Sequence, residues 1–223
     1  MNSFLVKEIK KWKGSGSRPQ DGLDWSNSAV NWIRDFPDHA SFIESLPQVI
    51  DRNYLRGTCG STEIANAHKF LAVMIWGYSN LGYGTYRVSR IMSQANFDWI
   101  LDNVTDLANS GNPKGAYDFL MRNRINGFGP SYSSKFISFN TPRDISAPIL
   151  DSLILRWIGD YALEEYDGFS VKKMNWNLRT YSHYCDWVGV YAEKCEVFPD
   201  EVELVLFRIA EQEYSSSSNW ATK

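Results

Sequence analysis

The spacing of apolar side chains predicts a chain built mainly from helices. From about residue 25 onward, apolar residues recur every three or four positions, which is the period of an amphipathic helix. No alternating strand pattern of useful length appears, although residues 1–13 could hold a short strand. The fold class is therefore predicted to be all-α, with helices over residues 28–36, 38–54, 61–78, 86–92, 96–108, 113–124, 130–139, 151–161, 174–196 and 200–214.

Helix-breaking and capping residues divide the pattern. Residues 14–24 are rich in Gly, Ser, Pro and Asp and predict a linker. Asp200 and Glu203 have the spacing of a capping box at the start of the last helix. We therefore predict a basic N-terminal segment and linker over 1–24, one helical domain over 25–214, and a flexible tail over 215–223.

Composition agrees with a folded domain of this size. The 223 residues are 43% hydrophobic and 15% aromatic, which suffices for one large domain or two small lobes sharing a cleft. The net charge of -3 argues against nucleic-acid binding, but the charge is uneven. Residues 1–20 and 113–143 are basic, whereas residues 193–213 are acidic. Because local field steers a polyanion more than total charge does, the objection is weak.

The three cysteines, Cys59, Cys185 and Cys195, exclude several classes of site. Their number is odd and no pair has the CxxC spacing, so neither a disulfide framework nor a cysteine-rich zinc site is supported. A four-cysteine iron–sulfur cluster is likewise unsupported. No signal peptide opens the sequence and no apolar run reaches about 18 residues, which predicts a cytoplasmic protein without a membrane partner.

The segment Ile125-Asn126-Gly127-Phe128-Gly129-Pro130 joins two predicted helices by a tight turn. Its glycines allow positive φ and close approach of another backbone, and Pro130 restarts a helix whose first N–H groups point outward. Such a helix start suits an anion, for example a DNA phosphate. The alternative is an ordinary helix–helix turn that uses glycine for its geometry.

About twenty residues after this turn, Asp151 heads another predicted helix, within PILDSLILRWI. Asp is a favoured N-cap, so a purely structural role is one interpretation. The other is chemical, because a helix N-terminus keeps a carboxylate charged. A charged carboxylate is what an oxocarbenium-like transition state of glycosidic cleavage needs beside it.

Taken together, INGFGPSYSSKFISF and the downstream PILDSLILRWI resemble the helix-hairpin-helix (HhH-GPD) DNA glycosylase superfamily. The resemblance covers residues 113–160 most firmly, with the hairpin motif over 113–139. IWGYSNLGYGTYRVSRIM and the closing DEVELVLFRIA are similar to the bacterial 8-oxoguanine-glycosylase-like branch. The resemblance implies a two-lobed helical fold with a cleft between the lobes, a double-stranded DNA partner and a monomeric protein.

The resemblance also implies roles for individual residues. Asp151 would be the catalytic carboxylate that stabilises the sugar cation and orients the attacking water. The DNA backbone would be bound by Asn126, Gly127, Gly129, Ser131 and Lys135. The backbone carbonyls of Asn123, Ile125 and Phe128 could hold a Na⁺ or K⁺ ion that bridges to a phosphate, and no other cofactor is implied.

At one position the sequence departs from the family pattern. Members that also nick DNA carry a lysine where this chain has Ser131, and serine cannot form the Schiff base of a lyase. We therefore expect a monofunctional enzyme that leaves an abasic site. Lys135 lies one turn further on the same face of the helix. Three roles are open for it: a phosphate contact, a solvated side chain or a displaced nucleophile.

Aromatic side chains are candidates for holding a flipped-out base. They come from the segment 76–90, as a pocket or an intercalating wedge, and comprise Trp76, Tyr78, Tyr83 and Tyr86 together with Arg87. The alternative is that Trp76 and Tyr78 finish a buried helix. A second segment, from Trp176 to Trp187, fits an amphipathic helix that packs its rings inward.

Three functions remain open at this point. The first is hydrolytic removal of a modified base, either 8-oxoguanine-like or a hypermodified phage base such as glucosylated hydroxymethylcytosine in antiviral defence. The second is a non-catalytic DNA-binding module that uses only the hairpin. The third is a helical protein–protein scaffold with a fortuitous glycine turn.

Overall fold

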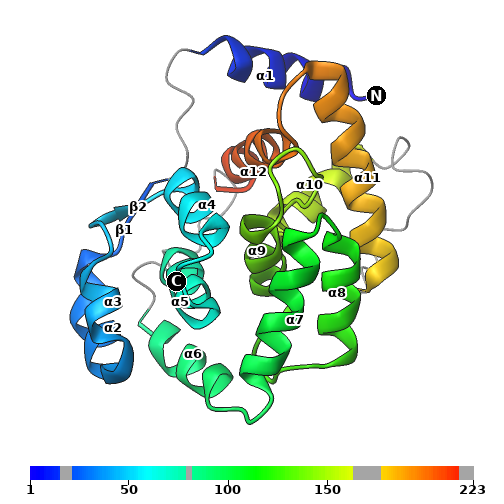
Figure 1. Cartoon of the computed structure of the whole chain (residues 1–223). Helices are drawn as coiled ribbons and strands as arrows, with labels where there is room; N and C mark the ends of the chain where they lie inside the picture. Colours follow the sequence, from blue (N-terminus) through cyan, green and yellow to red (C-terminus); the bar gives the residue numbers. More distant parts are fainter. Residues whose placement is uncertain (16–21, 79–81, 163–176, 216–223) are drawn as a thin grey trace, which may run out of the picture. The chain divides into compact units, whose positions relative to one another are not determined.

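The computed structural model describes residues 1–15, 22–78, 82–162 and 177–215, and over these residues the chain is helical (Figure 1). The all-α fold class is thus confirmed. The helices are α1 (Ser3–Gly14), α2 (Ala29–Asp35), α3 (Ala40–Glu44), α4 (Arg52–Gly60), α5 (Asn66–Tyr78), α6 (Gly84–Met92), α7 (Phe97–Asn109), α8 (Pro113–Arg122), α9 (Pro130–Asn140), α10 (Ser152–Tyr161), α11 (Leu178–Cys195) and α12 (Pro199–Ser215). Two 3-10 turns, Ser26–Ser28 and Pro37–His39, precede α2 and α3, and β1 (Leu23–Asp24) pairs antiparallel with β2 (Val49–Ile50).

The chain divides into two compact units. Unit 2 is continuous and comprises residues 19–142, so it holds the helices from α2 to α9. Unit 1 is discontinuous, because it combines residues 1–18 with residues 143–223 and thus α1 with α10, α11 and α12. No helix in the described parts of either unit has the length and apolar character needed to cross a membrane.

Unit 2 is built around α5. Nine of its thirteen residues are buried, among them the continuous run from Lys69 to Trp76, as expected for a helix whose second half is apolar on most sides. The ring of Phe70 lies at its centre and makes edge-to-face contacts with Phe97, Phe128 and Phe136, at centroid distances of 5.1, 5.3 and 6.0 Å. These rings come from α7, the α8–α9 turn and α9, so the core fixes α9 against its neighbours.

In unit 1, α12 is the central helix, and α1, α10 and α11 all pack against it. Leu5, Ile9 and Trp12 are the buried residues of α1, at the spacing of one helix face. The guanidinium of Arg208 lies over the ring of Trp12 at 4.8 Å from its centroid. The N-terminal segment is therefore a packed helix capped by Asn2, and the expectation of a short strand over 1–13 is wrong.

Two further element boundaries differ from the sequence prediction. Residues 38–54 were expected to form one helix, but α3 ends at Glu44 and α4 begins at Arg52. Pro47 cannot continue a helix, and Asp51 starts a new one by accepting a hydrogen bond from the Tyr54 N–H at 2.7 Å. The helix expected over 61–78 begins only at Asn66.

The start of α12 uses different residues from those predicted for its capping box. The helix begins at Pro199, and the Glu201 carboxylate accepts a hydrogen bond from the Phe198 N–H at 3.0 Å. The helix therefore begins one to two residues earlier than the Asp200–Glu203 pairing requires. Asp200 is instead available to bind Arg143.

Candidate active site

The helix-hairpin-helix lies in unit 2 and consists of α8, the turn 123–129 and α9. Gly127 has φ +89°, a left-handed conformation that glycine adopts without strain. Gly129 has an ordinary φ of −75°, and a Cβ added there would meet nothing within 4 Å. Pro130 has no N–H and Gly129 has no side chain, so no side chain caps the first turn of α9. This start of α9 can therefore accept an anion.

A residue that the sequence did not single out holds this turn. The side-chain amide of Gln94, between α6 and α7, accepts a hydrogen bond from the Asn126 N–H at 2.9 Å. It donates another to the Asn126 carbonyl at 3.0 Å. Beside it, Ile91 of α6 lies 3.5 Å from where a Gly127 Cβ would stand. Nothing in the local pattern identifies Gln94, because its partner lies 32 residues away.

The first two turns of α9 carry Ser131, Tyr132 and Lys135. The Lys135 ammonium donates a hydrogen bond to the Ser131 hydroxyl at 3.1 Å, which confirms that the two side chains share one face. The same ammonium lies 5.4 Å from the centroid of the Tyr132 ring. An amine is thus held beside the Ser131 hydroxyl.

Tyr132 stacks on Tyr78 of α5, with ring centroids 4.3 Å apart and an interplanar angle of 15°. Burial is the main cause that raises the pKa of both phenols, so both stay neutral at physiological pH. Tyr83 meets the edge of Tyr78 at 5.9 Å. Of these three rings, Tyr78 and Tyr83 were predicted from the sequence, whereas Tyr132 was not.

The exposed face of α6 and its N-cap carries two aromatic–arginine pairs at helical spacing. The Arg87 guanidinium lies 4.7 Å from the ring centroid of Tyr83, and that of Arg90 lies 5.7 Å from the centroid of Tyr86. The two tyrosines are 48% and 63% exposed, so both rings remain accessible to a ligand. The spacing of four residues in each pair is a signal that could have identified Arg90 in advance.

Trp76 is placed differently from these residues. It lies in the interior of unit 2 with 5% of its surface exposed, where its ring meets Phe139 edge-on at 5.3 Å and Arg52 lies over it. Tyr78 is 1% exposed. Both residues end a buried helix, which was the alternative left open by the sequence.

The second aromatic segment also packs its described rings inward. Tyr181, Tyr184 and Trp187 are buried residues of α11 in unit 1. Trp176 lies outside the described residues. The inward-packing helix was the alternative expected for this segment.

Asp151 lies in unit 1 at the N-cap of α10. One of its carboxylate oxygens accepts a hydrogen bond from the Leu153 N–H at 2.8 Å, so its structural role as a cap is present. Among the described residues, no hydrogen bond engages the second oxygen, and the side chain is half-buried. The cap therefore orients the carboxylate and still leaves one oxygen for a ligand.

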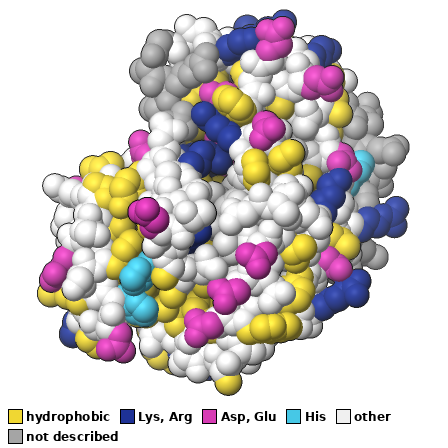
Figure 2. Space-filling model, viewed as in Figure 1, with side chains coloured by type: hydrophobic (Ala, Val, Ile, Leu, Met, Phe, Trp, Pro, Cys, Tyr) yellow, Lys and Arg dark blue, Asp and Glu magenta, His cyan; other side chains and the backbone are white. Residues whose placement is uncertain are grey.

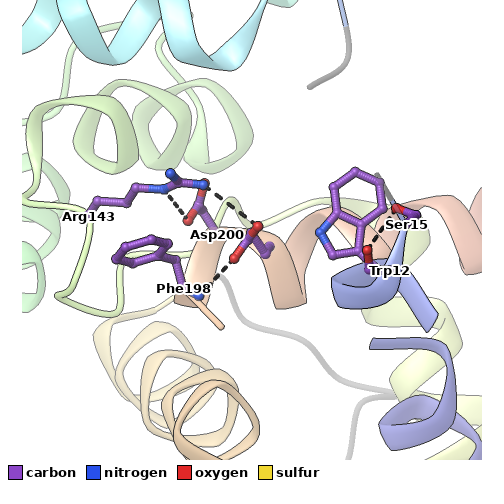
Figure 3. Close-up of polar contacts among 6 residues, drawn as sticks. Trp12, Ser15, Arg143, Phe198 and Asp200 are labelled. Atoms are coloured by element: carbon purple, nitrogen blue, oxygen red, sulfur yellow. Dashed lines mark hydrogen bonds and ion pairs between the residues drawn. The ribbon is translucent and has the colours of Figure 1, made fainter. Parts of the chain in front are cut away.

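The loop that leads to Asp151 is tied down within unit 1. At its start, the Arg143 guanidinium binds Asp200 at 3.2 Å and approaches Glu201 at 3.9 Å (Figure 3). It also lies 4.2 Å from the ring centroid of Phe198. Further along, the Ser146 hydroxyl donates to the Cys185 carbonyl at 2.6 Å. These contacts restrict the loop before it reaches the catalytic candidate.

Charge is segregated on the surface of unit 2. Asp98, Asp102 and Asp106 recur every four residues on the exposed side of α7, and Figure 2 shows a row of acidic side chains there. In contrast, the exposed face of α6 carries Arg87 and Arg90. The net negative charge of the chain therefore coexists with a local pair of exposed arginines on α6.

Comparison with known proteins gives one family. A mainly helical chain with a glycine-containing turn between α8 and α9 and a helix-capping aspartate beyond it has the elements of a helix-hairpin-helix DNA-binding protein. The chain belongs to the family described as "Putative 8-oxoguanine DNA glycosylase OGG-like protein", whose family model matches residues 17–207. No curated protein and no solved structure matches it. Membership in this family points to DNA glycosylase activity and thus to DNA as the partner.

Proposed function

We propose that this protein is a monofunctional DNA glycosylase that hydrolyses the N-glycosidic bond of a flipped-out modified base. The observation that carries the proposal is the uncapped start of α9 behind the positive-φ turn at Gly127. That geometry presents backbone amides to a phosphate without a side chain in the way. Family membership supplies the expectation of base excision.

In this proposal Asp151 performs the chemistry. Its second oxygen stabilises the positive charge that develops on the sugar as the bond to the base breaks, and it orients the attacking water. The hydrogen bond from Leu153 and the anchored loop before it hold the carboxylate in one orientation. Pre-organised charge of this kind costs no rearrangement when the transition state forms.

The DNA backbone is bound by the hairpin. Gly127, Gly129 and the Ser131 amide approach one phosphate, the exposed Asn126 side chain lies beside them, and Lys135 adds a positive charge on the same face. The carbonyls of Asn123, Ile125 and Phe128 would hold a Na⁺ or K⁺ ion, for which carbonyl oxygens are suitable ligands. The Ile125 carbonyl accepts a hydrogen bond from the Phe128 N–H, and an oxygen of this kind has a second lone pair for a cation.

The extruded base is held by the exposed rings of Tyr83 and Tyr86, with Arg87 beside them. Stacking on aromatic faces tolerates many bases, so the identity of the substrate is decided by hydrogen bonds to the base edge. Two substrate classes fit this proposal: an oxidised purine such as 8-oxoguanine, and a hypermodified cytosine such as the glucosylated hydroxymethyl form found in phage DNA. Trp76 has no direct role, because its ring is enclosed in the core.

A panel of duplexes tests the proposal directly. Each duplex carries one modified base, and it is incubated with the protein and then analysed with and without alkali. Strand breaks that appear only after alkali identify a monofunctional enzyme and name its base. Binding to the panel without any base release would favour the non-catalytic DNA-binding module instead.

Breaks without alkali would contradict the monofunctional mechanism and would direct attention to Lys135. Its amine lies 3.1 Å from the Ser131 hydroxyl and is the nearest substitute for the missing lysine. Trapping with borohydride would then form a covalent complex with the wild-type protein. Lys135→Met would abolish that complex if Lys135 were the nucleophile.

A further inference from the structure

We propose that Gln94 is a positioning residue that holds the hairpin turn in its DNA-binding conformation. The inference rests on the proposed function, because it assigns the role of the turn to DNA binding. Gln94 lies in the connection from α6 to α7, outside both helices of the hairpin. Its side chain nevertheless makes two of the hydrogen bonds that the turn receives from elsewhere in unit 2.

The geometry fixes the orientation of the Gln94 amide. Its nitrogen donates to the Asn126 carbonyl at 3.0 Å and to the Arg90 carbonyl at 3.1 Å, which uses both of its hydrogens. Its oxygen accepts from the Asn126 N–H at 2.9 Å. A flipped amide would direct its oxygen at two carbonyl oxygens, so the observed orientation is the only one that satisfies the three groups.

The turn needs this support because it lies at the surface. Asn126 and Gly127 are exposed, and the turn has little side-chain burial of its own between the anchors Ile125 and Phe128. Without a partner, the Asn126 peptide groups would be solvated and the turn would sample other conformations. Gln94 restricts the turn, because its side-chain amide bonds both the N–H and the carbonyl of Asn126, as a residue of a neighbouring strand would.

The same side chain couples the turn to α6. Its third hydrogen bond goes to the carbonyl of Arg90, and the Arg90 side chain belongs to the exposed aromatic–arginine face. Gln94 therefore links the two surfaces of unit 2 that the proposed function assigns to DNA. Its loss should weaken DNA binding and leave the chemical step at saturation unchanged, because Gln94 contacts neither Asp151 nor the sugar.

The experiment compares Gln94→Met with Ser93→Ala. Methionine keeps the length of the side chain and removes all three hydrogen bonds. Ser93 is the matched control, because its hydroxyl donates to the same Arg90 carbonyl at 3.2 Å but does not contact the hairpin. We expect Kd for duplex DNA to rise about 3- to 10-fold in Gln94→Met, because the turn loses the two hydrogen bonds that hold it. Ser93→Ala should bind as the wild type does.

Three additional measurements separate positioning from general destabilisation. Hydrogen exchange of the Asn126 amide should be protected in the wild type and in Ser93→Ala, and should accelerate at least tenfold in Gln94→Met. The single-turnover rate at saturating enzyme should stay at the wild-type value, and the melting temperature should fall by no more than roughly 2–4 °C, because the lost hydrogen bonds lie at the surface. A Kd that stays unchanged in Gln94→Met, or an equal fall in the saturated rate, would overturn the inference.

This inference and the proposed function fail separately. A wild-type protein that binds DNA and releases no base from the panel refutes the glycosylase function, while the Kd comparison still supports or overturns the role of Gln94. Base release by the wild type, together with wild-type Kd in Gln94→Met, retains the glycosylase and overturns the role of Gln94.

Discussion

Replacing Asp151 by Asn separates the two roles of this side chain. The Asn side-chain oxygen can accept the same hydrogen bond from the Leu153 N–H, now 2.8 Å long, so the cap of α10 is kept. Only the favourable interaction of a negative charge with the helix N-terminus is lost, which is worth about 0.3–1 kcal/mol. For a protein of this size that corresponds to a decrease in melting temperature of roughly 1–4 °C.

The effect on catalysis should be far larger. A carboxylate about 4 Å from a sugar cation contributes on the order of 4 kcal/mol at the effective dielectric constant of a half-buried site. Asparagine carries no charge, so the single-turnover rate of base release should fall about a thousandfold. Asp151→Ala should lose the same activity and, in addition, about 1 kcal/mol of stability, because alanine cannot cap the helix.

The assay follows base release under single-turnover conditions on a duplex that carries the base identified by the panel, with alkali cleavage as the readout. Circular dichroism gives the melting temperature of each variant. The matched control is Asp51→Asn, because Asp51 caps α4 by the same kind of bond, 2.7 Å from the Tyr54 N–H. If Asp151→Asn released base within threefold of the wild-type rate, or if Asp51→Asn lost as much activity, the catalytic assignment would be refuted.

Three other perturbations test parts of the structure. Gly127→Ala forces alanine into φ +89° and should cost about 1–2 kcal/mol of stability, measured by thermal melting. Gly129→Ala should melt like the wild type but bind DNA about tenfold more weakly, measured by fluorescence anisotropy. Wild-type binding by Gly129→Ala would contradict the hairpin interface. Arg143→Ala removes the ion pair with the buried Asp200 carboxylate and the nearby positive charge from Glu201, and should lower the melting temperature by roughly 4–8 °C, about 2 kcal/mol. The exposed pair Arg122–Asp118 serves as control, since Arg122→Ala should cost only about 0.3–0.5 kcal/mol. All three cysteines are buried, and burial raises the pKa of Cys59 to about 12. Ellman's reagent at pH 8 should therefore detect three thiols in guanidinium and no rapidly reacting thiol in the native protein. A rapid reaction of the native protein with the reagent would show that the thiols are accessible.

The sequence predicted those parts of the site that depend on neighbours in the chain. Pro130 and the glycines before it place the start of α9, because these residues restrict or free the backbone of their own turn. Asp151 caps α10 for a similarly local reason. Lys135 reaches Ser131 because residues four apart share a helix face.

Contacts between distant segments could not be predicted in this way. The bond between Gln94 and Asn126 exists only once α6 and the hairpin are packed together, and no spacing rule connects them. The burial of Trp76 depends on Phe139 and Arg52, which belong to other helices. The helix α1 was missed for another reason: four lysines among its twelve residues hid the spacing of Leu5, Ile9 and Trp12.

The discontinuous composition of unit 1 has a consequence for biosynthesis. On the ribosome, α1 emerges before any residue of unit 2, yet the helices that cover Leu5, Ile9 and Trp12 are translated after the whole of that unit. The apolar residues of α1 therefore stay uncovered by their partners in the nascent chain while unit 2 folds. Unit 1 can complete its folding only after the α12 segment has left the exit tunnel, because α1, α10 and α11 all pack against α12.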